Sequence, residues 1–355
     1  MRLPRWLPAG RREWLWFGAR LFAAALVLTG SLLYSLSMPL SSAPQTLPPL
    51  APGERELVHR LKVHVRELAV HIGQRNIWTP GSMEAAAAYI EATLAGLGHA
   101  PARQEFPVLG RTCLNLEVEL PGHEEPEEIL VVGAHYDTVP GSPGANDNAS
   151  GVAALLELAR LLRQEQPGRT IRLVAFANEE APFYYSEEMG SRRYASRCKE
   201  RREKIVAMFS LETLGHYSDA SGSQGYPFPL GLFYPQTGNF LAFVGNIPSR
   251  PLVRRAIRSF RQQASLPSEG IAAPGLVTGI GWSDHWSFWQ EGYQAIMLTD
   301  TAFFRSAHYH TARDTEEKLD YQRLARAVSG LARTLVALAD ENGQGKNGAP
   351  MEAQR

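Results

Sequence analysis

The sequence contains little cysteine, no excess of either charge and no internal repeat. Its 355 residues include two cysteines, Cys113 and Cys198, which are too few for a framework of disulfides. They leave two alternatives, a single bridge or two buried thiols. Lysine and arginine together number 36, as do aspartate and glutamate, so no overall field favours nucleic acid as a partner. With 44% hydrophobic residues, the chain can bury one large core or two small ones.

Near the N-terminus lies one long hydrophobic run. Residues 15–36 are almost entirely apolar, and this length can cross a bilayer with a hydrocarbon core of about 30 Å. Four arginines precede the run, so the positive-inside rule places the basic segment 1–14 in the cytoplasm. A signal peptide cleaved after Ala43 is the alternative, but Pro44 follows and should hinder cleavage. We expect an uncleaved anchor, with the main domain periplasmic or extracellular.

Beyond the anchor, the sequence predicts a linker, one folded domain and a tail. Residues 37–52 are rich in serine and proline and predict an extended linker. Residues 53–340 alternate apolar strands with amphipathic helices, which is typical of a single α/β domain whose mainly parallel sheet is flanked by helices. Residues 341–355 are polar and predict a disordered tail. The expected helices are 54–72, 82–97, 149–162, 193–198, 251–263 and 319–338, and the expected strands are 114–120, 129–134, 171–177, 205–211 and 295–298.

Two local features accompany these elements. Ser82 is expected to cap the start of helix 82–97, and Gly98 is expected to end it. Strands 114–120 and 129–134 are joined by a short connection that contains proline and glycine. This connection predicts that the two strands form an antiparallel pair at an edge of the sheet.

Ionisable side chains gather where the apolar strands end. They are His135 and Asp137 after strand 129–134, Glu179 and Glu180 after strand 171–177, and Glu212 after strand 205–211. The carboxyl ends of parallel strands share one edge of a sheet, which is where ligands bind in open α/β folds. Asp147, in a loop rich in glycine and asparagine, and His310 can converge on the same edge.

Each of these residues has an ordinary explanation when taken alone. Asp147 could cap a helix or stabilise a turn, and Glu179–Glu180 could be a solvated turn. Together, so many carboxylates at adjacent strand ends would repel one another unless a cation neutralised them. Imidazole and carboxylate ligands suit catalytic Zn²⁺ or a related divalent ion, so the pattern predicts a metal site.

Five pieces of sequence, in this order and spacing, resemble peptidase family M28, a family of zinc aminopeptidases and carboxypeptidases. They are Gly133–Thr138, Gly144–Gly151, Asn178–Glu180, Ser283–His285, and Tyr309–Thr311 together with Asp314–Thr315. The resemblance covers most of residues 57–338 and implies two divalent metal ions, with zinc favoured. It implies peptide substrates and a water-dependent hydrolysis of the peptide bond.

The resemblance also implies a role for each residue. As metal ligands it implies His135 and Glu212 for one ion, Glu180 and His310 for the other, and Asp147 as the bridge between them. As catalytic residues it implies Glu179 as the general base, Asp137 as the hydrogen-bond partner of the far nitrogen of His135, and Tyr309 as a stabiliser of the oxyanion.

The sequence departs from the family pattern at two places. The family usually has aspartate where this chain has Glu212, which is one methylene longer but carries the same carboxylate. A second acidic pair, Glu187–Glu188, competes with Glu179–Glu180, and we choose the latter because it ends a strand. Residues 181–186 then form a short insertion whose aromatic side chains either line a substrate pocket or cover the edge of the sheet.

His285 is a second candidate for the ligand position assigned to His310. We choose His310 because it stands in a His-Thr…Asp-Thr context, and we expect Asp284 and His285 to lie behind the ligands. His216 and His308 are expected to have no metal role, and the basic run 192–204 is expected to be a solvated helix face.

The sequence therefore predicts a membrane-anchored di-zinc exopeptidase, most simply an aminopeptidase that releases N-terminal residues of peptides. A glutaminyl-cyclase-like enzyme, which would use a single zinc, is one alternative. A non-catalytic ectodomain that only binds peptides is the other. The complete set of five ligands together with the base favours the di-zinc enzyme.

Overall fold

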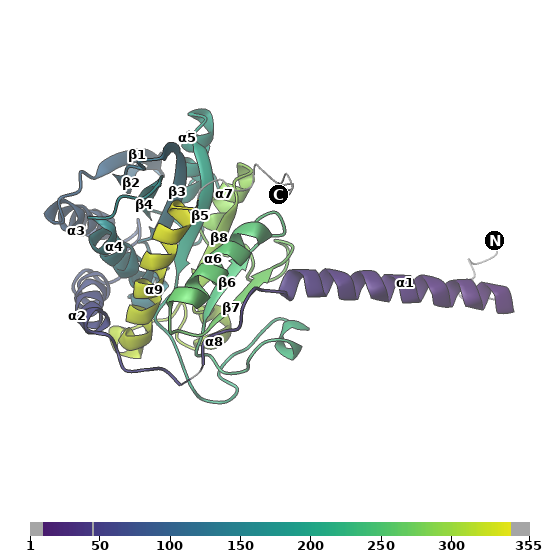
Figure 1. Ribbon diagram of the computed structural model, residues 1–355. Coiled ribbons are helices and arrows are strands. Elements are labelled where there is room, and N and C mark those ends of the chain that lie inside the picture. The colour runs from purple at the N-terminus through teal and green to yellow at the C-terminus, as the bar shows by residue number, and fades with distance from the viewer. Residues whose placement is uncertain (1–9, 45, 342–355) are drawn as a thin grey trace, which may run out of the picture. The chain divides into compact units, whose positions relative to one another are not determined.

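A computed structural model describes residues 10–44 and 46–341, and the chain divides into two units, 1–37 and 38–355 (Figure 1). The first unit contains helix α1 (Arg11–Leu36). Among the described residues, α1 is the one helix that is long and apolar enough to cross a membrane. The expected tail, apart from Glu341, and most of the expected cytoplasmic segment lie outside the described residues.

The second unit is built around an eight-stranded sheet with the order β1-β2-β4-β3-β5-β8-β6-β7. Its strands are β1 (Ala102–Val108), β2 (Arg111–Leu120), β3 (Glu125–His135), β4 (Arg169–Phe176), β5 (Lys204–Glu212), β6 (Leu241–Gly245), β7 (Ser268–Ala272) and β8 (Ala295–Thr299). The four central strands β4, β3, β5 and β8 are mutually parallel. The predicted α/β domain with a mainly parallel sheet is therefore confirmed.

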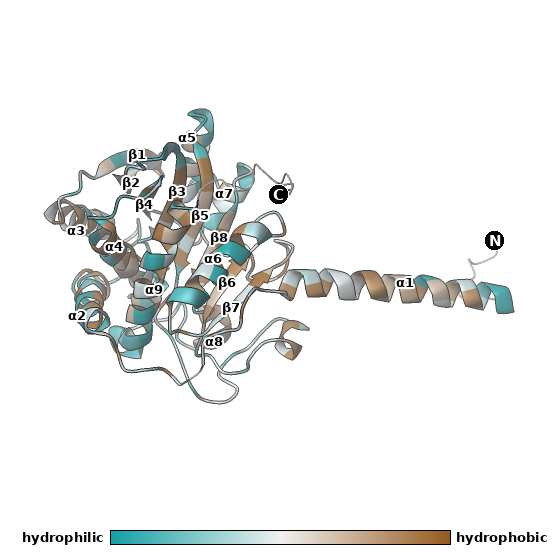
Figure 2. Cartoon of the chain, viewed as in Figure 1, coloured by the Kyte–Doolittle hydropathy of each residue, from teal (hydrophilic) through white to brown (hydrophobic). Residues whose placement is uncertain are grey.

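Helices cover both faces of this sheet (Figure 1). They are α2 (Pro52–Arg66), α3 (Ser82–Gly96), α4 (Gly151–Leu162), α5 (Gly190–Glu200), α6 (Arg250–Gln263), α7 (His285–Gln290), α8 (Ala302–Arg305) and α9 (Tyr321–Ala339), with π-helical turns Glu67–Ile72 and Ala145–Ser150 and short 3-10 turns Leu230–Leu232 and Glu316–Lys318. In β3, the side chains of Leu130 and Val132 belong to the hydrophobic core on the face of the sheet that α2, α3, α4, α6 and α9 cover. The side chains of Ile129 and Val131 belong to the core on the opposite face, which α5 and α7 cover. A strand buried on both faces explains the continuous apolar run, seen as hydrophobic colouring in Figure 2.

Every helix and strand expected from the sequence is present, and five further elements are β1, β6, β7, α7 and α8. Those five are short or, in the case of β1, largely exposed, so they carry weak periodic signals. The expected cap at Ser82 is wrong, because Gly81 precedes the helix and Ser82 is its first residue. Gly98 does follow the helix, with φ +87°.

The expected antiparallel pair of β2 and β3 is also wrong, because β4 lies between them and β2 pairs with β1 and β4. The connection after β2 crosses the start of β4, where the His123 amide donates to Pro167 O at 3.0 Å. A β-carbon at Gly122 would lie 2.6 Å from the backbone of Arg169 and Thr170. The short connection is therefore possible because glycine allows this close crossing.

Of the two alternatives for the cysteines, the structure shows two free, buried thiols. Cys113 packs in the core on the α4 side of the sheet, and Cys198 packs in the core on the α5 side. The sheet therefore separates the two thiols.

In the segment expected to be a linker, the described residues 38–44 and 46–51 form neither helix nor strand and contact the domain. Ser268 N donates to Ser42 Oγ at 2.8 Å, Arg261 donates to Leu40 O at 2.7 Å, and Arg326 donates to Pro48 O. These contacts hold residues on both sides of position 45 against α6, β7 and α9 of the same unit.

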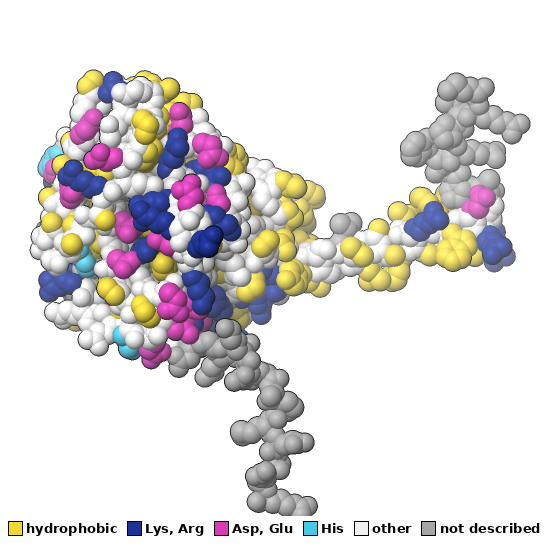
Figure 3. Space-filling view, turned by 90° about the horizontal axis from the view of Figure 1, so that it is seen from above, with side chains coloured by type: hydrophobic (Ala, Val, Ile, Leu, Met, Phe, Trp, Pro, Cys, Tyr) yellow, Lys and Arg dark blue, Asp and Glu magenta, His cyan; other side chains and the backbone are white. Residues whose placement is uncertain are grey.

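One face of the molecule carries basic and acidic side chains interspersed (Figure 3). Several members of the basic run 192–204 are paired with carboxylates, among them Arg197 with Glu117 at 2.8 Å. The run therefore belongs to a network of ion pairs of mixed sign.

Candidate metal centre

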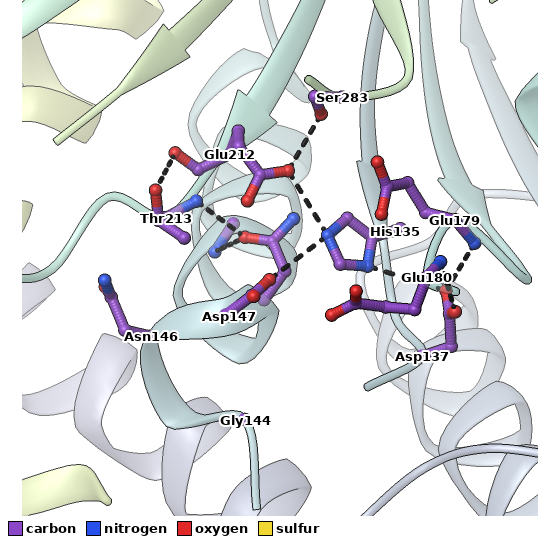
Figure 4. A network of polar contacts seen from close by, with 12 residues as sticks. His135, Asp137, Gly144, Asn146, Asp147, Glu179, Glu180, Glu212, Thr213 and Ser283 are labelled. Carbon is purple, nitrogen blue, oxygen red and sulfur yellow. Dashed lines mark hydrogen bonds and ion pairs between the residues drawn. The ribbon is translucent and has the colours of Figure 1, made fainter. Parts of the chain in front are cut away.

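The ionisable residues converge at the carboxyl ends of β3, β4 and β5 (Figure 4). His135 is the last residue of β3, Glu212 is the last residue of β5, and Glu180 follows β4. Asp147 lies on the π-helical turn before α4, and His310 lies in the loop after α8, at φ +56°. Residues far apart in the sequence therefore face a common space.

The carboxylate of Asp147 lies between two groups of possible ligands. Its Oδ1 is 3.4 Å from His135 Nε2, which in turn is 3.2 Å from Glu212 Oε2. Its Oδ2 is 2.9 Å from His310 Nε2, which is 3.3 Å from Glu180 Oε2. Within each group the ligand atoms lie within 4.8 Å of one another, and His135 forms a third such group with Glu179 and Glu180. Asp147 therefore offers one oxygen to each of the first two groups.

The buried atoms of this cluster fit the coordination of divalent cations. Both ring nitrogens of His135, both side-chain oxygens of Asp147 and one oxygen of Glu180 have no hydrogen-bond partner among the described residues. Buried polar atoms are normally satisfied, and His135 Nε2 and both oxygens of Asp147 are atoms that would ligate an ion, whereas His135 Nδ1 faces Asp137. Two imidazoles with several carboxylates form a ligand set that suits Zn²⁺.

The electrostatics of the cluster also favour a cation. Burial raises the pKa of Glu179 well above its ordinary value, and the neighbouring carboxylates add to this effect. Burial and the charge of Asp147 raise the pKa of Glu180 to about 8. Burial lowers the pKa of His310, but the carboxylates of Asp147 and Glu180 outweigh it and raise that pKa to about 10. A bound divalent ion would relieve this excess of negative charge.

Asp137 fixes the backbone that carries the two adjacent glutamates. Its Oδ1 accepts a hydrogen bond from Glu179 N and its Oδ2 accepts one from Glu180 N, both at 3.0 Å. Its Oδ1 also lies 3.5 Å from His135 Nδ1. Asp137 therefore positions three members of the cluster at once.

Other buried groups orient Asp147 and Glu212. Asp314 accepts hydrogen bonds from the backbone amides of Asn146 and Asp147, at 2.9 and 3.0 Å. Ser283 donates to Glu212 Oε2 at 2.8 Å. Glu212, although longer than the aspartate usual in the family, thus reaches His135 with its carboxylate held in place.

Two buried residues of this region were not found by sequence reasoning. Asp300 directly follows β8, and its carboxylate accepts a hydrogen bond from the Asn146 side chain at 2.9 Å. Its position after an apolar strand is a sequence signal that could have identified it. Arg75 is fully buried, and no pattern in the sequence marks it. Five backbone carbonyl oxygens accept hydrogen bonds from its guanidinium, those of Leu68, Gly73, Tyr136, Pro143 and Gly144.

Arg75 therefore ties the loop between β3 and Asp147 to the helical layer, and its loss should destabilise the domain. We expect Arg75→Met to lower the free energy of unfolding by about 3 kcal/mol, because it leaves buried carbonyl oxygens without donors. Denaturant titration measures this change. Arg201→Met, at an exposed turn, is the control and should change the free energy little. Equal stability of both variants would contradict the role of Arg75.

The residues that the sequence offered as alternative ligands or as an alternative base lie outside the ligand groups. Glu187 pairs with Arg192 at 3.0 Å, and Glu188 belongs to no ligand group among the described residues. His285 Nε2 lies 2.8 Å from Ile280 O, and its ring packs against Trp289, so His285 points away from the ligands. His216 and His308 likewise belong to no ligand group in the described part of the chain.

The aromatic residues of the 181–186 insertion pack against neighbouring loops. Phe183 stacks on Trp78 with ring centroids 5.7 Å apart, and Tyr184 donates to Gly281 O at 3.0 Å. Tyr309, in contrast, stacks on His310 at 3.8 Å and lines a pocket beside Glu212. Tyr309 therefore lies directly beside one of the possible ligands, His310.

The chain is similar to known proteins in sequence and in fold. A model of peptidase family M28 matches residues 115–335. A protein of Escherichia coli (strain K12), described as uncharacterized protein YfbL, is 38% identical over 78% of this chain and 87% of its own length. A zinc aminopeptidase from Bacillus subtilis shares the fold with a TM-score of 0.63 and 16% identity, over 79% of this chain and 95% of the other.

A glutaminyl cyclase of Porphyromonas gingivalis also shares the fold, with a TM-score of 0.61 and 19% identity, over 79% of this chain and 98% of the other. The fold alone therefore does not separate these activities. The match of the family model over most of the domain, together with the identity to the E. coli protein, shows that the chain belongs to peptidase family M28 and is a metallopeptidase.

Proposed function

We propose that the protein is a membrane-anchored aminopeptidase that uses two divalent metal ions, zinc being favoured. The observation that carries the proposal is the position of Asp147, whose two oxygens face two separate groups of ligands. His135 and Glu212 would hold one ion, Glu180 and His310 would hold the other, and Asp147 would serve both. When bound, such a pair of ions polarises a peptide carbonyl and lowers the pKa of a water.

The residues of the chain would perform the proton transfers. Glu179 is buried at the cluster, and Asp137 fixes its backbone, so its carboxylate is placed to take a proton from the attacking water and deliver it to the leaving amine. Burial raises the pKa of Tyr309 well above its ordinary value, so the phenol keeps its proton. Tyr309 can therefore donate a hydrogen bond to the oxyanion that develops on the substrate.

Purified full-length protein in detergent tests the proposal. We expect two bound metal ions by mass spectrometry, loss of activity on chelation, and release of the first residue from peptides with a free α-amine. N-acetylated peptides of the same sequence are the matched control and should not be cleaved. One ion together with cyclisation of N-terminal glutamine would favour the cyclase, and absence of ions and turnover would favour the non-catalytic ectodomain.

Part of the proposal is that residues 1–36 anchor the protein, with the catalytic domain on the extracytoplasmic side. The apolar run within helix α1 and the four arginines that precede this run support this topology. Protease added to intact cells or spheroplasts should digest the domain and spare cytoplasmic markers. Protection of the domain together with those markers, under conditions that digest a periplasmic marker, would contradict the topology.

A further inference from the structure

A large pocket opens beside the metal centre and runs away from it over the last three strands of the sheet. Glu212 and Tyr309 lie at its metal end, and the pocket contains about 810 Å³ of space not filled by atoms, part of it open to solvent. Residues of β8, β6 and β7 form its floor, which is the face of the sheet opposite to α6 and α9.

The register of the strands fixes the length of this floor. Glu212 pairs with Thr299, Thr299 with Ala242, and Ala242 with Glu269, so one row of residues crosses β5, β8, β6 and β7. All four line the pocket. Directly paired residues project from the same face of a sheet. Three strand spacings therefore separate the two glutamates, a distance of roughly 14 Å between their backbones.

The walls of the pocket are apolar and largely aromatic. The next row on the same face contributes Met297, Val244 and Ile271. Aromatic rings surround the space, those of Tyr226, Tyr234, Phe240, Trp282, Phe303 and Phe304. The two tyrosine hydroxyls donate to backbone oxygens, Tyr226 to Pro235 O and Tyr234 to Gly270 O at 2.6 Å, so neither is left to serve a ligand.

Glu269 is the ionisable group at the far end of this apolar space. Its side chain is partly buried, with 22% of its surface exposed, and the hydrogen bonds of the described residues include none donated to its carboxylate. Arg261 lies 3.6 Å away, but its guanidinium donates to Pro39 O, Leu40 O and Ser268 O. Arg261 therefore offsets part of the charge of Glu269 without satisfying its oxygens.

We infer that this pocket receives the side chain of the first residue of the substrate, and that Glu269 selects a basic side chain, arginine or lysine. The inference rests on the proposed aminopeptidase function. With the scissile bond at Glu212 and Tyr309, only a long side chain extends along the floor to Glu269. A carboxylate that lacks donors gains charge-assisted hydrogen bonds from a guanidinium or ammonium group, and the aromatic walls favour a cation as well.

The preference should depend on pH through Glu269. Burial raises the pKa of this carboxyl, and the charge of Arg261 lowers it in part; Tyr226 and Tyr234 also face it. A carboxylate with a raised pKa loses its charge as the pH falls. The preference for basic over apolar first residues should therefore decrease as the pH falls. Because this preference is a ratio of kcat/KM for two substrates, pH effects common to both substrates cancel.

Fluorogenic amides of single amino acids test the inference on full-length protein. The measured quantity is kcat/KM for arginine and lysine amides relative to the methionine amide, which is similar in length and uncharged. We expect the wild type to prefer the basic amides, and Glu269→Gln to lower the ratio by about tenfold or more, because a charge-assisted pair is lost. Glu269→Met should abolish the preference for the basic amides over the methionine amide. Glu127→Gln, at an exposed position, is the control.

The outcomes separate this inference from the proposed function. Cleavage of the methionine amide with no preference for basic residues would overturn the role of Glu269 and leave the aminopeptidase in place. The same would follow if Glu269→Gln and Glu127→Gln kept the wild-type ratio. Failure of the wild type to release any first residue would overturn the proposed function itself.

Discussion

Glu179→Gln is expected to lower kcat by about 10²- to 10⁴-fold, the usual contribution of general acid–base catalysis. Glutamine keeps the size of the side chain and its capacity for hydrogen bonds, but it cannot accept the proton of the attacking water. Asp137 holds the backbone amides of both Glu179 and Glu180, and we propose that the two side chains serve different tasks. We expect Glu179→Gln to retain both metal ions and nearly the wild-type KM.

Glu187→Gln is the matched control, because Glu187 belongs to the rival acidic pair and forms a surface ion pair with Arg192. It should leave kcat unchanged. Glu180→Gln should instead weaken metal binding, because Glu180 Oε2 lies 3.3 Å from His310 Nε2 in the group that contains Asp147, whereas Glu179 shares a group only with His135 and Glu180. Metal stoichiometry and kcat measured on the same preparations decide the assignment. Loss of metal in Glu179→Gln with retention in Glu180→Gln would reverse the two roles.

The sequence predicts the central sheet well, for a physical reason. Strands β3, β4 and β5 are buried on both faces and give continuous apolar runs, each followed by ionisable residues. The edge of the sheet is less predictable. β1 exposes most of its residues, and the insertion of β4 between β2 and β3 depends on a crossing at Gly122 that local patterns do not encode.

The convergence of the residues of the candidate metal centre could be predicted, whereas most of the residues that support them could not. His135, Glu180 and Glu212 stand at strand ends, and a cluster of like charges there requires an explanation. Arg75 acts through five backbone oxygens, and backbone acceptors have no signature in a sequence. Glu269 is on a five-residue strand, and its place in the pocket follows only from the register with β6.

Asp147→Ala is expected to have the largest effect on metal content, because Asp147 is the residue whose two oxygens face both ligand groups. Removal of a ligand that serves both ions should abolish binding of both and reduce activity to background. Glu212→Ala is the matched comparison, since Glu212 belongs to the His135 group alone and its loss should spare the other ion. Mass spectrometry of the native proteins measures both stoichiometries.

Thermal unfolding gives an independent test of whether Asp147 serves both metal ions. A ligand that binds only the folded state stabilises it by RT ln(1 + [L]/Kd), so zinc should raise the melting temperature of the chelated wild type. Asp147→Ala should melt at the same temperature with and without zinc, and Glu212→Ala should keep part of the shift. Two bound ions and an undiminished zinc shift in Asp147→Ala would show that the two groups of ligands do not depend on Asp147, and the assignment of the bridge would then be wrong.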